Sequence, residues 1–370
     1  MTEDRGAQSF DVVIVGAGMA GASLAAELAP HATVLVLETE DRPGFHATGR
    51  SAAFWVESYG GPPILPLTVA SGAYLAEHGF LIDRGGLNIA RKDQLDQLDR
   101  FQQLYSEAGI RLERWDRARM ESHVPGLLSD WVEAVMEPDS KDIDVGGLHN
   151  HYLAIARRGG VEIRCRAGLA AAVREGGRWR LTLADGSTVS CDTLVNAAGA
   201  WADPVAEMAG VRPVGVQPLR RTMVQLRTVP EAAPDMPLVL DIGGSFYFKP
   251  ESGRLWLTPH DEHPCAPCDA APEELDVAIA IDRLEHVVDW KIERVEHKWA
   301  GLRSFAPDRA PVYGPDPREP SFFWFAGQGG FGIQTAPAAA RLASQIMLGL
   351  PADEMTARLD AELYSARRFG

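Results

Sequence analysis

A glycine-rich turn near the N-terminus constrains the fold of this chain more than any other feature. Residues 10–15 (FDVVIV) form a short apolar run rich in Val and Ile, which predicts a buried parallel strand. The run leads into a G-x-G-x-x-G motif at 16–21 and then into a predicted helix over 22–28. A second predicted strand over 33–37 ends at Glu38. This order of elements predicts a Rossmann-like unit that binds a dinucleotide.

The glycines of the motif have different expected roles. Gly16 permits the tight turn, Gly18 lets the backbone approach a pyrophosphate, and Gly21 allows the helix to pack closely on the strand. The amides at the helix N-terminus, where Ala20 lies, would receive the phosphates. Glu38 suits the ribose hydroxyls and would repel a 2′-phosphate, which disfavours NADP. The motif leaves NAD and FAD open, and a glycine turn can also serve packing alone.

Length and composition limit the class of protein. A chain of 370 residues predicts two domains, or three. It carries 36 Lys and Arg against 51 Asp and Glu, a net charge of −15, which argues against a nucleic-acid partner. No apolar run approaches the ~18–20 residues needed to span a bilayer. Residues 1–5 lack a signal-peptide pattern, and four cysteines are too few for a disulfide scaffold. We therefore expect a cytoplasmic protein without a membrane span.

Three further glycine-punctuated segments point to the same ligand. Residues 43–53 follow the first unit and are expected to become helical. Residues 193–201 read as a strand and a small-residue turn, and 322–335 as a strand and a glycine turn before a helix over 336–348. The carboxyl ends of strands in an open parallel sheet lie along one edge, where ligands bind. These segments are therefore predicted to surround one cofactor.

Together these stretches resemble the FAD-dependent D-amino acid oxidase superfamily, and more closely its D-arginine dehydrogenase branch. The resemblance covers nearly the whole chain in family order. It rests on GFHATGRSAA (44–53), VNAAGAW (195–201), SFYFKP (245–250), WAGLRSF (299–305) and GQGGFGIQT (327–335). The resemblance implies non-covalent FAD. Related sarcosine oxidases carry a flavin-linking Cys shortly after the WAGLR-like segment, whereas residues 307–317 contain none.

The resemblance also implies the architecture. An α/β fold is expected, with a Rossmann-like FAD-binding domain interleaved with an α+β substrate domain on a mostly antiparallel sheet. A charged amphipathic helix within 93–108 and strands within 221–256 suit the substrate domain. We expect residues 1–83, 142–213 and 302–370 to form the FAD-binding domain, and residues 84–141 and 214–301 to form the substrate-binding domain.

The cofactor residues follow from the same matches. A helix beginning after 327–334 would point its positive end at the flavin pyrimidine edge and stabilise the anionic reduced flavin. Residues 47–54 would run along the isoalloxazine. Val173 matches a position whose backbone touches adenine, although core packing explains it equally well. The predicted cofactor-binding residues are Gly16, Gly18, Ala20, Gly21, Glu38, Thr39, Ala47, Thr48, Gly49, Arg50, Ser51, Ala52, Ala53, Phe54, Val173, Ala198, Gly199, Trp201, Gly329, Gly330, Phe331, Gly332, Ile333 and Gln334.

Oxidation of an amino acid requires that its carboxylate be held while Cα–H faces flavin N5. Arginine holds a carboxylate with two parallel donors, which lysine does not. The resemblance places Arg303 on the carboxylate and gives Tyr247 as a second donor. An ion-paired surface arginine and a core aromatic are the ordinary alternatives for these two residues. Further matches to substrate-site positions are Tyr59, Arg220, Gly330 and Gln334. Arg221 is adjacent to Arg220, so either could face the site, and we favour Arg220.

Two departures bear on the substrate. The arginine-specific relative has a Glu that pairs with the guanidinium, and residues 84–87 here (RGGL) carry Gly at that position. A His and a Thr of the relative's flavin-side stretch are Phe54 and Val56 here. Loss of an acidic partner from a partly buried cation site costs several kcal/mol. We therefore expect neutral or hydrophobic D-amino acids as substrates.

The expected reaction is hydride transfer from Cα to flavin N5, giving an imino acid that hydrolyses to a 2-oxo acid and ammonia. Desolvation would keep the reacting amine neutral, so no strong protein base is required. The carboxylate clamp also suits N-methylated or cyclic secondary amines, or a 2-hydroxy acid. A non-enzymatic flavin sensor and an NAD-linked dehydrogenase are further alternatives. The electron acceptor, whether oxygen, a quinone or another compound, stays open.

One loop contains residues that could form a metal site, as an alternative to a solvated loop. His260, His263, Cys265 and Cys268 include types of ligand that zinc favours. The spacing between the His pair and the Cys pair is short for a zinc site, and three prolines stiffen the loop. We expect a solvated loop without metal, with thiol redox chemistry as a minor alternative. Three other histidines, His46, His149 and His151, are expected to pack against the cofactor loop or within the structure.

Overall fold

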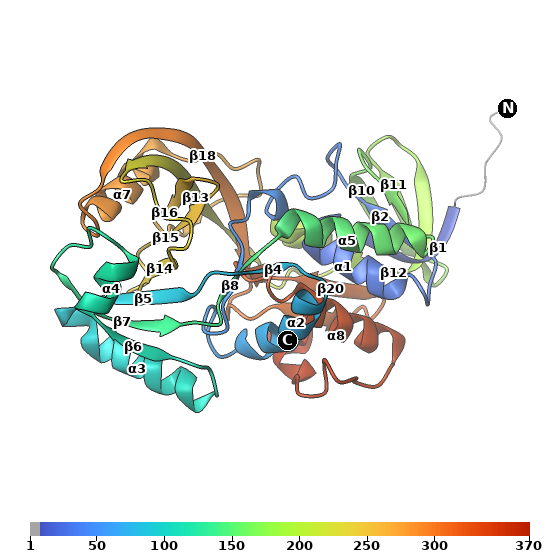
Figure 1. The fold of residues 1–370 in the computed structure, drawn as a ribbon. Coiled ribbons are helices and arrows are strands. Elements are labelled where there is room, and N and C mark those ends of the chain that lie inside the picture. Colours follow the sequence, from blue (N-terminus) through green and yellow to red (C-terminus); the bar gives the residue numbers. More distant parts are fainter. Residues whose placement is uncertain (1–7) are drawn as a thin grey trace.

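Two large sheets organise residues 8–370, the range that the computed structural model describes (Figure 1). The interpretation of residues 1–5 as lacking a signal pattern falls outside this range. Among the helices of the described residues, none combines the length and apolarity needed to cross a membrane. A small three-stranded sheet joins the two larger ones: β3 (Phe54–Trp55), β8 (Lys141–Ile143) and β4 (Leu81–Asp83).

The first sheet has the predicted Rossmann arrangement. β1 (Gln8–Val15) pairs in parallel with β2 (Val34–Leu37) on one side and with β12 (Thr188–Asn196) on the other. β9 (Glu162–Arg164) and β20 (Phe322–Ala326) extend the parallel part. The chain moves from β1 to β2, and β12 lies on the opposite side, so the strand order reverses beside β1. Ligands bind at such a switch point. Antiparallel strands complete the sheet: β10 (Leu169–Glu175), β11 (Arg178–Leu183) and β19 (Val312–Pro315).

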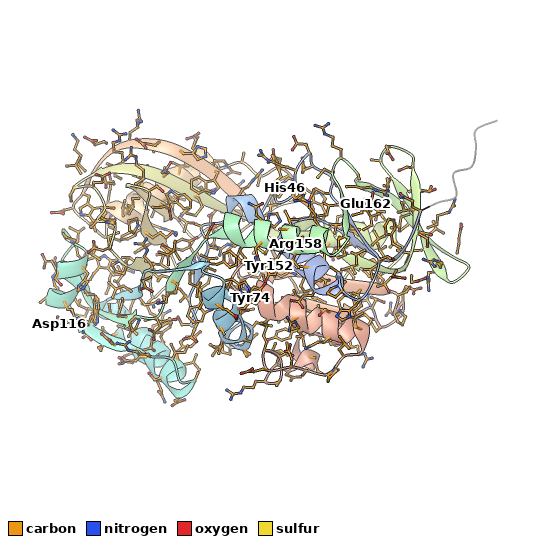
Figure 2. The ribbon with its side chains drawn as sticks, turned by 45° about the vertical axis from the view of Figure 1, so that its right-hand side comes forward. His46, Tyr74, Asp116, Tyr152, Arg158 and Glu162 are labelled. Carbon is orange, nitrogen blue, oxygen red and sulfur yellow. The ribbon has the colours of Figure 1, made fainter. Side chains whose placement is uncertain are left out.

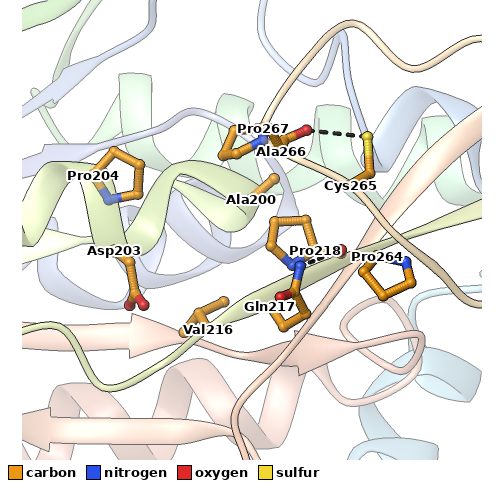
Figure 3. A pocket seen from close by; sticks show the side chains of 10 residues that line it. All are labelled: Ala200, Asp203, Pro204, Val216, Gln217, Pro218, Pro264, Cys265, Ala266 and Pro267. Carbon is orange, nitrogen blue, oxygen red and sulfur yellow. Dashed lines mark hydrogen bonds between the residues drawn. The ribbon is translucent and has the colours of Figure 1, made fainter.

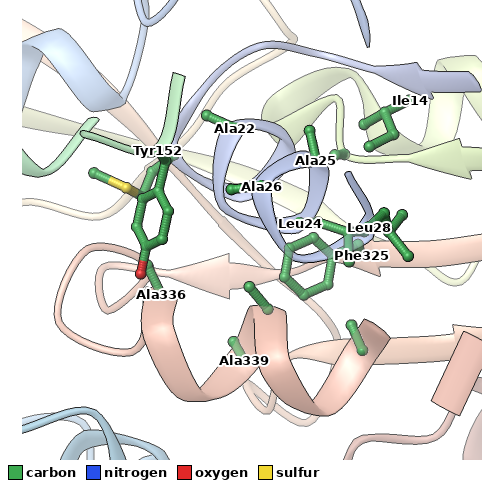
Figure 4. Close-up of a cluster of buried hydrophobic side chains, with 14 of the residues drawn as sticks. Ile14, Ala22, Leu24, Ala25, Ala26, Leu28, Tyr152, Phe325, Ala336 and Ala339 are labelled. Carbon is green, nitrogen blue, oxygen red and sulfur yellow. The ribbon is translucent and has the colours of Figure 1, made fainter. Parts of the chain in front are cut away.

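Helices cover one face of this sheet. They are α1 (Met19–Leu28), α2 (Leu65–Glu77), α5 (Val145–Arg158) and α8 (Ala336–Leu348). Alanines of α1, including Ala22 and Ala26, share a buried cluster with Ala336 and Ala339 of α8, and these small side chains allow close approach of the helices (Figure 4). Tyr152 of α5 stacks on Tyr74 of α2, with ring centroids 6.0 Å apart (Figure 2). The bounds of α8, Ala336–Leu348, confirm the predicted helix over 336–348.

The second sheet is mostly antiparallel, as expected. Its long strands β13 (Gln217–Val229) and β18 (Lys291–Phe305) pair along most of their length. Only the contact between β5 and β14 is parallel among the described strands of this sheet. The other strands are β5 (Gly86–Arg91), β6 (Glu113–Asp116), β7 (Trp131–Glu137), β14 (Leu238–Asp241), β15 (Tyr247–Glu251), β16 (Arg254–Thr258), β17 (His263–Pro264) and β21 (Gln328–Gly329). Its helices are α3 (Leu95–Glu107), α4 (Arg117–His123) and α7 (Glu274–Glu285).

Two local expectations differ from the structure. The segment after residue 43 does not become helical beyond one 3-10 turn, η1 (Thr48–Arg50). It continues into β3 instead, because Phe54 and Trp55 pair with β8. Two strands of the second sheet do not follow the proposed domain division: its boundary before residue 302 cuts β18, which continues to Phe305, and β21 (Gln328–Gly329) lies within 302–370. Arg303 therefore stands on the second sheet.

Candidate functional site

A cavity of about 650 Å³ lies between the carboxyl edge of the first sheet and the second sheet. Its volume is within the usual range for cofactor and ligand sites. Most of the predicted residues line it: Gly16, Gly18, Ala20, Glu38, Thr39, Ala47, Thr48, Arg50, Ser51, Ala52, Ala53, Phe54, Tyr59, Ala198, Gly199, Trp201, Tyr247, Arg303, Gly329, Gly330, Gly332, Ile333 and Gln334. The three strand ends inferred from the sequence do meet around one cavity.

The glycine turn after β1 is packed against backbone on two sides. Gly16 has φ +103°, and a Cβ there would lie 2.5 Å from the carbonyl oxygen of Ala197, the residue after β12. A Cβ on Gly21 would lie 1.8 Å from the carbonyl oxygen of Gly16. Any side chain at either position would force α1 away from the sheet. The turn therefore holds the N-terminus of α1 at the edge of the cavity.

Two polar side chains brace this turn. Glu38 accepts a hydrogen bond from the amide of Ala17 at 3.0 Å, and Thr48 accepts one from the amide of Met19 at 2.9 Å. Glu38 also accepts from the amide of Glu40 at 3.0 Å. A carboxylate can accept about four hydrogen bonds, so Glu38 retains capacity for the hydroxyls of a ribose.

Four predicted cofactor residues lie outside the cavity lining. Gly21 and Gly49 pack against backbone, and the ring of Phe331 contacts Tyr59 instead. Val173 is 46% exposed, so it neither lines the cavity nor packs in the core. Strand β10 meets the cavity only at its start, where Gly168 and Leu169 line the wall.

Arg303 on β18 is the centre of a polar group on the second-sheet side of the cavity. Its Nη1 donates a hydrogen bond to the hydroxyl of Tyr59 at 2.8 Å. Gly330 lies directly against it, since a Cβ there would be 2.6 Å from Nη1. Burial would raise the pKa of Tyr59, but the positive charges of Arg303 and Arg221 outweigh burial and lower it. Burial raises the pKa of Tyr247, which lies in the same group.

Arg221, not the favoured Arg220, faces the cavity. Arg221 pairs across the sheet with Gly301 and is 4% exposed. Gly301 and Arg303 are two residues apart on β18, so their side faces the cavity and Arg221 shares it. Its Nη1 is buried and has no hydrogen-bond partner among the described residues. Arg220 points the other way and pairs with Asp276 at 3.0 Å.

His260 is a residue whose place at the site the sequence analysis missed. Its Nε2 lies 3.3 Å from the hydroxyl of Tyr59, and its Nδ1 faces the carbonyl oxygen of Gly244. Burial lowers the pKa of His260 to about 3, assisted by the charges of Arg221 and Arg303. His260 is therefore neutral near pH 7. No local signal in the sequence indicates this place, which follows from the pairing of Thr258, two residues earlier, with Tyr247 across the sheet.

The four residues of the alternative metal site, for which we expected no metal, do not come together. His260 faces Tyr59, whereas His263 Nε2 lies 3.0 Å from Asp276. The described residue group whose atoms could share an ion is Asp261, His263 and Asp276, and it contains neither cysteine. His149 Nε2 donates a hydrogen bond to the carbonyl oxygen of Ala17, 3.0 Å away, and so braces the glycine turn.

The segment that carries Tyr59 is anchored on buried polar groups. The side-chain amide of Gln334 donates to Thr68 Oγ1 at 2.9 Å and accepts from the amide of Val56 at 3.3 Å. The carboxylate of Glu137, 1% exposed, accepts from the amide of Glu57 at 2.8 Å. Gln334 thus lines the cavity and also fixes the loop that positions Tyr59.

The raised pKa of Glu57 predicts that the free energy of unfolding depends on pH. Burial raises its pKa to about 7 from an ordinary 4.5, with added repulsion from Glu137 and Asp139. Because the pKa of Glu57 is raised, the folded protein favours its protonated form. The contribution of Glu57 to the stability of the fold is therefore fully present below about pH 4.5 and is lost as pH rises through about 7 and Glu57 becomes charged. Glu57→Gln should therefore be more stable than the parent at pH 8 by about 1 kcal/mol, allowing for solvent screening, and equal to it near pH 4.

Thermal and urea unfolding at both pH values measure this difference. Glu293→Gln, on the exposed part of β18, provides the same charge change without burial. An identical gain for both variants at pH 8 would assign the effect to net charge and contradict the role of Glu57.

Known proteins share both the sequence pattern and the fold. The family described as "DAO: FAD dependent oxidoreductase" matches residues 11–346. The hydrogen cyanide synthase subunit HcnC of Pseudomonas aeruginosa is 24% identical over 421 residues, covering 98% of this chain and 97% of that protein. The 4-methylaminobutanoate oxidase (formaldehyde-forming) of Paenarthrobacter nicotinovorans is 25% identical, covering 96% of this chain and 46% of that protein.

A solved structure gives the same result for the fold. Glycine oxidase from Geobacillus kaustophilus superposes with a TM-score of 0.84 at 21% identity, covering 97% of this chain and 98% of that chain. At this identity the likeness concerns the fold alone.

Proposed function

The chain belongs to the DAO family of FAD-dependent oxidoreductases, and we propose that it oxidises the Cα–N bond of a free α-amino acid, preferably a neutral or hydrophobic D-amino acid. The observation that carries the proposal is half-buried Arg303 and buried Arg221 beside two tyrosines in the cofactor cavity. The preference for the D-enantiomer rests on the resemblance of the sequence motifs.

The residues present fit FAD. The glycine turn and the N-terminus of α1 would receive the pyrophosphate, and Glu38 would receive the adenosine ribose. The wall made by residues 47–54 and 329–334 would hold the flavin. When bound, FAD supplies the hydride acceptor for the reaction. No Cys occurs within 307–317, which supports a non-covalent complex.

The chain's own residues would hold the substrate. Arg303 would bind the carboxylate with two donors, and Tyr59, already 2.8 Å from Arg303 Nη1, would add a third. The unpartnered Nη1 of Arg221 offers a further donor to the same anion. Arg221 already contacts Glu262 at 3.3 Å, and a bound carboxylate would relieve the remaining repulsion between Arg221 and half-buried Arg303. Neutral His260 would support Tyr59 and add no third positive charge.

The side-chain part of the cavity supports a neutral substrate. The acidic residues that line the cavity within 8–370 are Glu38 and Glu40, and both follow β2 beside the glycine turn. Near Arg303 the lining includes Phe54, Met223 and Tyr247. A cationic substrate side chain would be desolvated there without a carboxylate partner, which costs several kcal/mol. D-Arg and D-Lys are therefore expected to be poor substrates.

A second candidate keeps the site and changes the amine. The relative named 4-methylaminobutanoate oxidase acts, by its name, on an N-methylated amino acid, and the carboxylate group of this chain would suit such a compound. A secondary amine needs room beside the reacting nitrogen, where Gly330 and Gln334 line the cavity.

Anaerobic mixing with a substrate panel tests the proposal. We expect D-Met, D-Phe and D-Leu to bleach the oxidised flavin band, with kcat/KM for D-Arg and D-Lys at least about tenfold lower. Bleaching only by N-methyl amino acids would select the second candidate. Bleaching only by L-enantiomers would contradict the chirality, and no bleaching by any amino acid would defeat the proposed function.

A further inference from the structure

Cys265 and Cys268 lie on the loop between β17 and α7 with their sulfur atoms in contact. Their Sγ atoms are 3.5 Å apart, and both residues are half-buried. A disulfide needs a sulfur–sulfur distance of about 2.05 Å, so closure requires a movement of about 1.5 Å. Side-chain rotation with a small loop shift supplies such a movement. Among the described residues, the structure gives this contact to no other pair of cysteines.

The two sulfurs face different spaces. Cys265 lines a hollow of about 390 Å³ together with Gln217, Pro264 and Ala266, and its thiol donates to the carbonyl oxygen of Ala266 at 3.2 Å (Figure 3). Cys268 lines the cofactor cavity. The pair therefore lies across the wall that separates this hollow from the cofactor cavity.

The loop is also tied to the cofactor wall. Asp269, directly after Cys268, forms an ion pair with Arg50, and Arg50 donates to the carbonyl oxygens of Ala270 at 2.9 Å and Ala300 at 3.1 Å. These contacts hold the backbone around Cys268 in place. The backbone of Cys265 is held separately, because its amide donates to Pro218 on β13 at 3.1 Å. Anchors on both sides keep the thiols together.

We propose that Cys265 and Cys268 form an oxidisable dithiol site that reacts with hydrogen peroxide to give a disulfide at the wall of the cofactor cavity. The Cys265 thiolate attacks one peroxide oxygen, the O–O bond breaks, and the departing oxygen leaves as water after taking up a proton. The Cys268 thiol then attacks the sulfenic sulfur of Cys265. The S–S bond forms, the S–O bond breaks, and a second water leaves. Two thiols lose two electrons and the peroxide gains them.

The order of the two steps follows from the surroundings. Cys265 faces the hollow, through which a small peroxide can reach it. Burial raises the pKa of Cys268, and the hydrogen bond and charge of Cys265 add to the shift, so the Cys268 thiolate is disfavoured. Cys268 is therefore the resolving thiol. Cys191, 0% exposed, has its pKa raised to about 12 by burial and should not react.

Peptide mass analysis of the full FAD-bound chain tests the site. The reduced protein is treated with hydrogen peroxide, quenched with iodoacetamide and digested with trypsin, which releases both cysteines in residues 255–283. We expect this peptide to become about 2 Da lighter and resistant to alkylation, at least about tenfold faster than Cys165 is modified, with full reversal by dithiothreitol. No amino acid is added, so the outcome is independent of the proposed function.

Variants separate the site from general thiol oxidation. Cys268→Ser should stop at a Cys265 sulfenic acid that dimedone traps, and Cys165→Ser should form the disulfide as the parent does. The flavin spectrum checks that each variant is folded. Three results would overturn the proposal: a 255–283 peptide that stays fully alkylatable while Cys165 oxidises, disulfide-linked dimers in place of the internal bond, or stoichiometric zinc that protects both thiols.

Discussion

Arg303→Ala is expected to lower kcat/KM for the best amino-acid substrate about 100- to 1,000-fold, equivalent to about 3–4 kcal/mol, without loss of bound FAD. The guanidinium is surrounded by Tyr59, Gly330 and the cavity, so a carboxylate placed there would lose its principal buried counter-charge. Arg221 stays nearby and prevents a complete loss. Steady-state kinetics with flavin absorbance measure both quantities in one sample.

The neighbouring arginines provide matched controls for this prediction. Arg221→Ala removes a buried cavity donor and should also lower kcat/KM, whereas Arg220→Ala removes an ion pair with Asp276 outside the cavity and should leave it within about twofold. Arg303→Lys keeps the charge but not the paired donors, so it should recover only part of the loss. An unchanged kcat/KM for Arg303→Ala would remove this residue from the site.

The cofactor side of the cavity could be predicted from the sequence because its signals are local. The order of strand, glycine turn, helix and acidic residue fixes Gly16 and Glu38 at one edge, and the rule for parallel strand ends brings residues 197–201 and 327–334 to the same place. None of these inferences requires a register between distant strands.

The second sheet could not be read in the same way. Whether Arg220 or Arg221 faces the cavity depends on the pairing of β13 with β18, and a shift of one residue reverses every side chain. His260 reaches Tyr59 only because β15 and β16 bring residues 247 and 258 together. Val173 resembles a core residue locally, and its exposure follows from the point where β10 leaves the cavity. These placements depend on contacts between segments far apart in the chain.

Gly21→Ala is expected to abolish stoichiometric FAD binding and to lower the free energy of unfolding by about 3 kcal/mol. A Cβ at this position would lie 1.8 Å from the carbonyl oxygen of Gly16, 3.0 Å from its carbonyl carbon and 3.3 Å from Ile14. Two of these atoms belong to the backbone of the turn, so no side-chain rotation relieves the clash, and α1 must move away from β1. Overpacking of this kind costs about 1–3 kcal/mol or more. Because α1 positions the amides that would receive the pyrophosphate, weaker FAD binding by about 100-fold should accompany the loss of stability.

Gly146→Ala is the matched control, since it makes the same change near the start of α5. Gly146 is exposed, and a Cβ there would meet only Asp144 at 3.8 Å. This variant should bind FAD normally and gain up to about 1 kcal/mol, because alanine favours the helix over glycine. Flavin absorbance after gel filtration and urea unfolding measure both variants. A Gly21→Ala protein that retains FAD at full stoichiometry would show that α1 can shift without opening the turn, and the close contact between Gly21 and Gly16 would then not be required for cofactor binding.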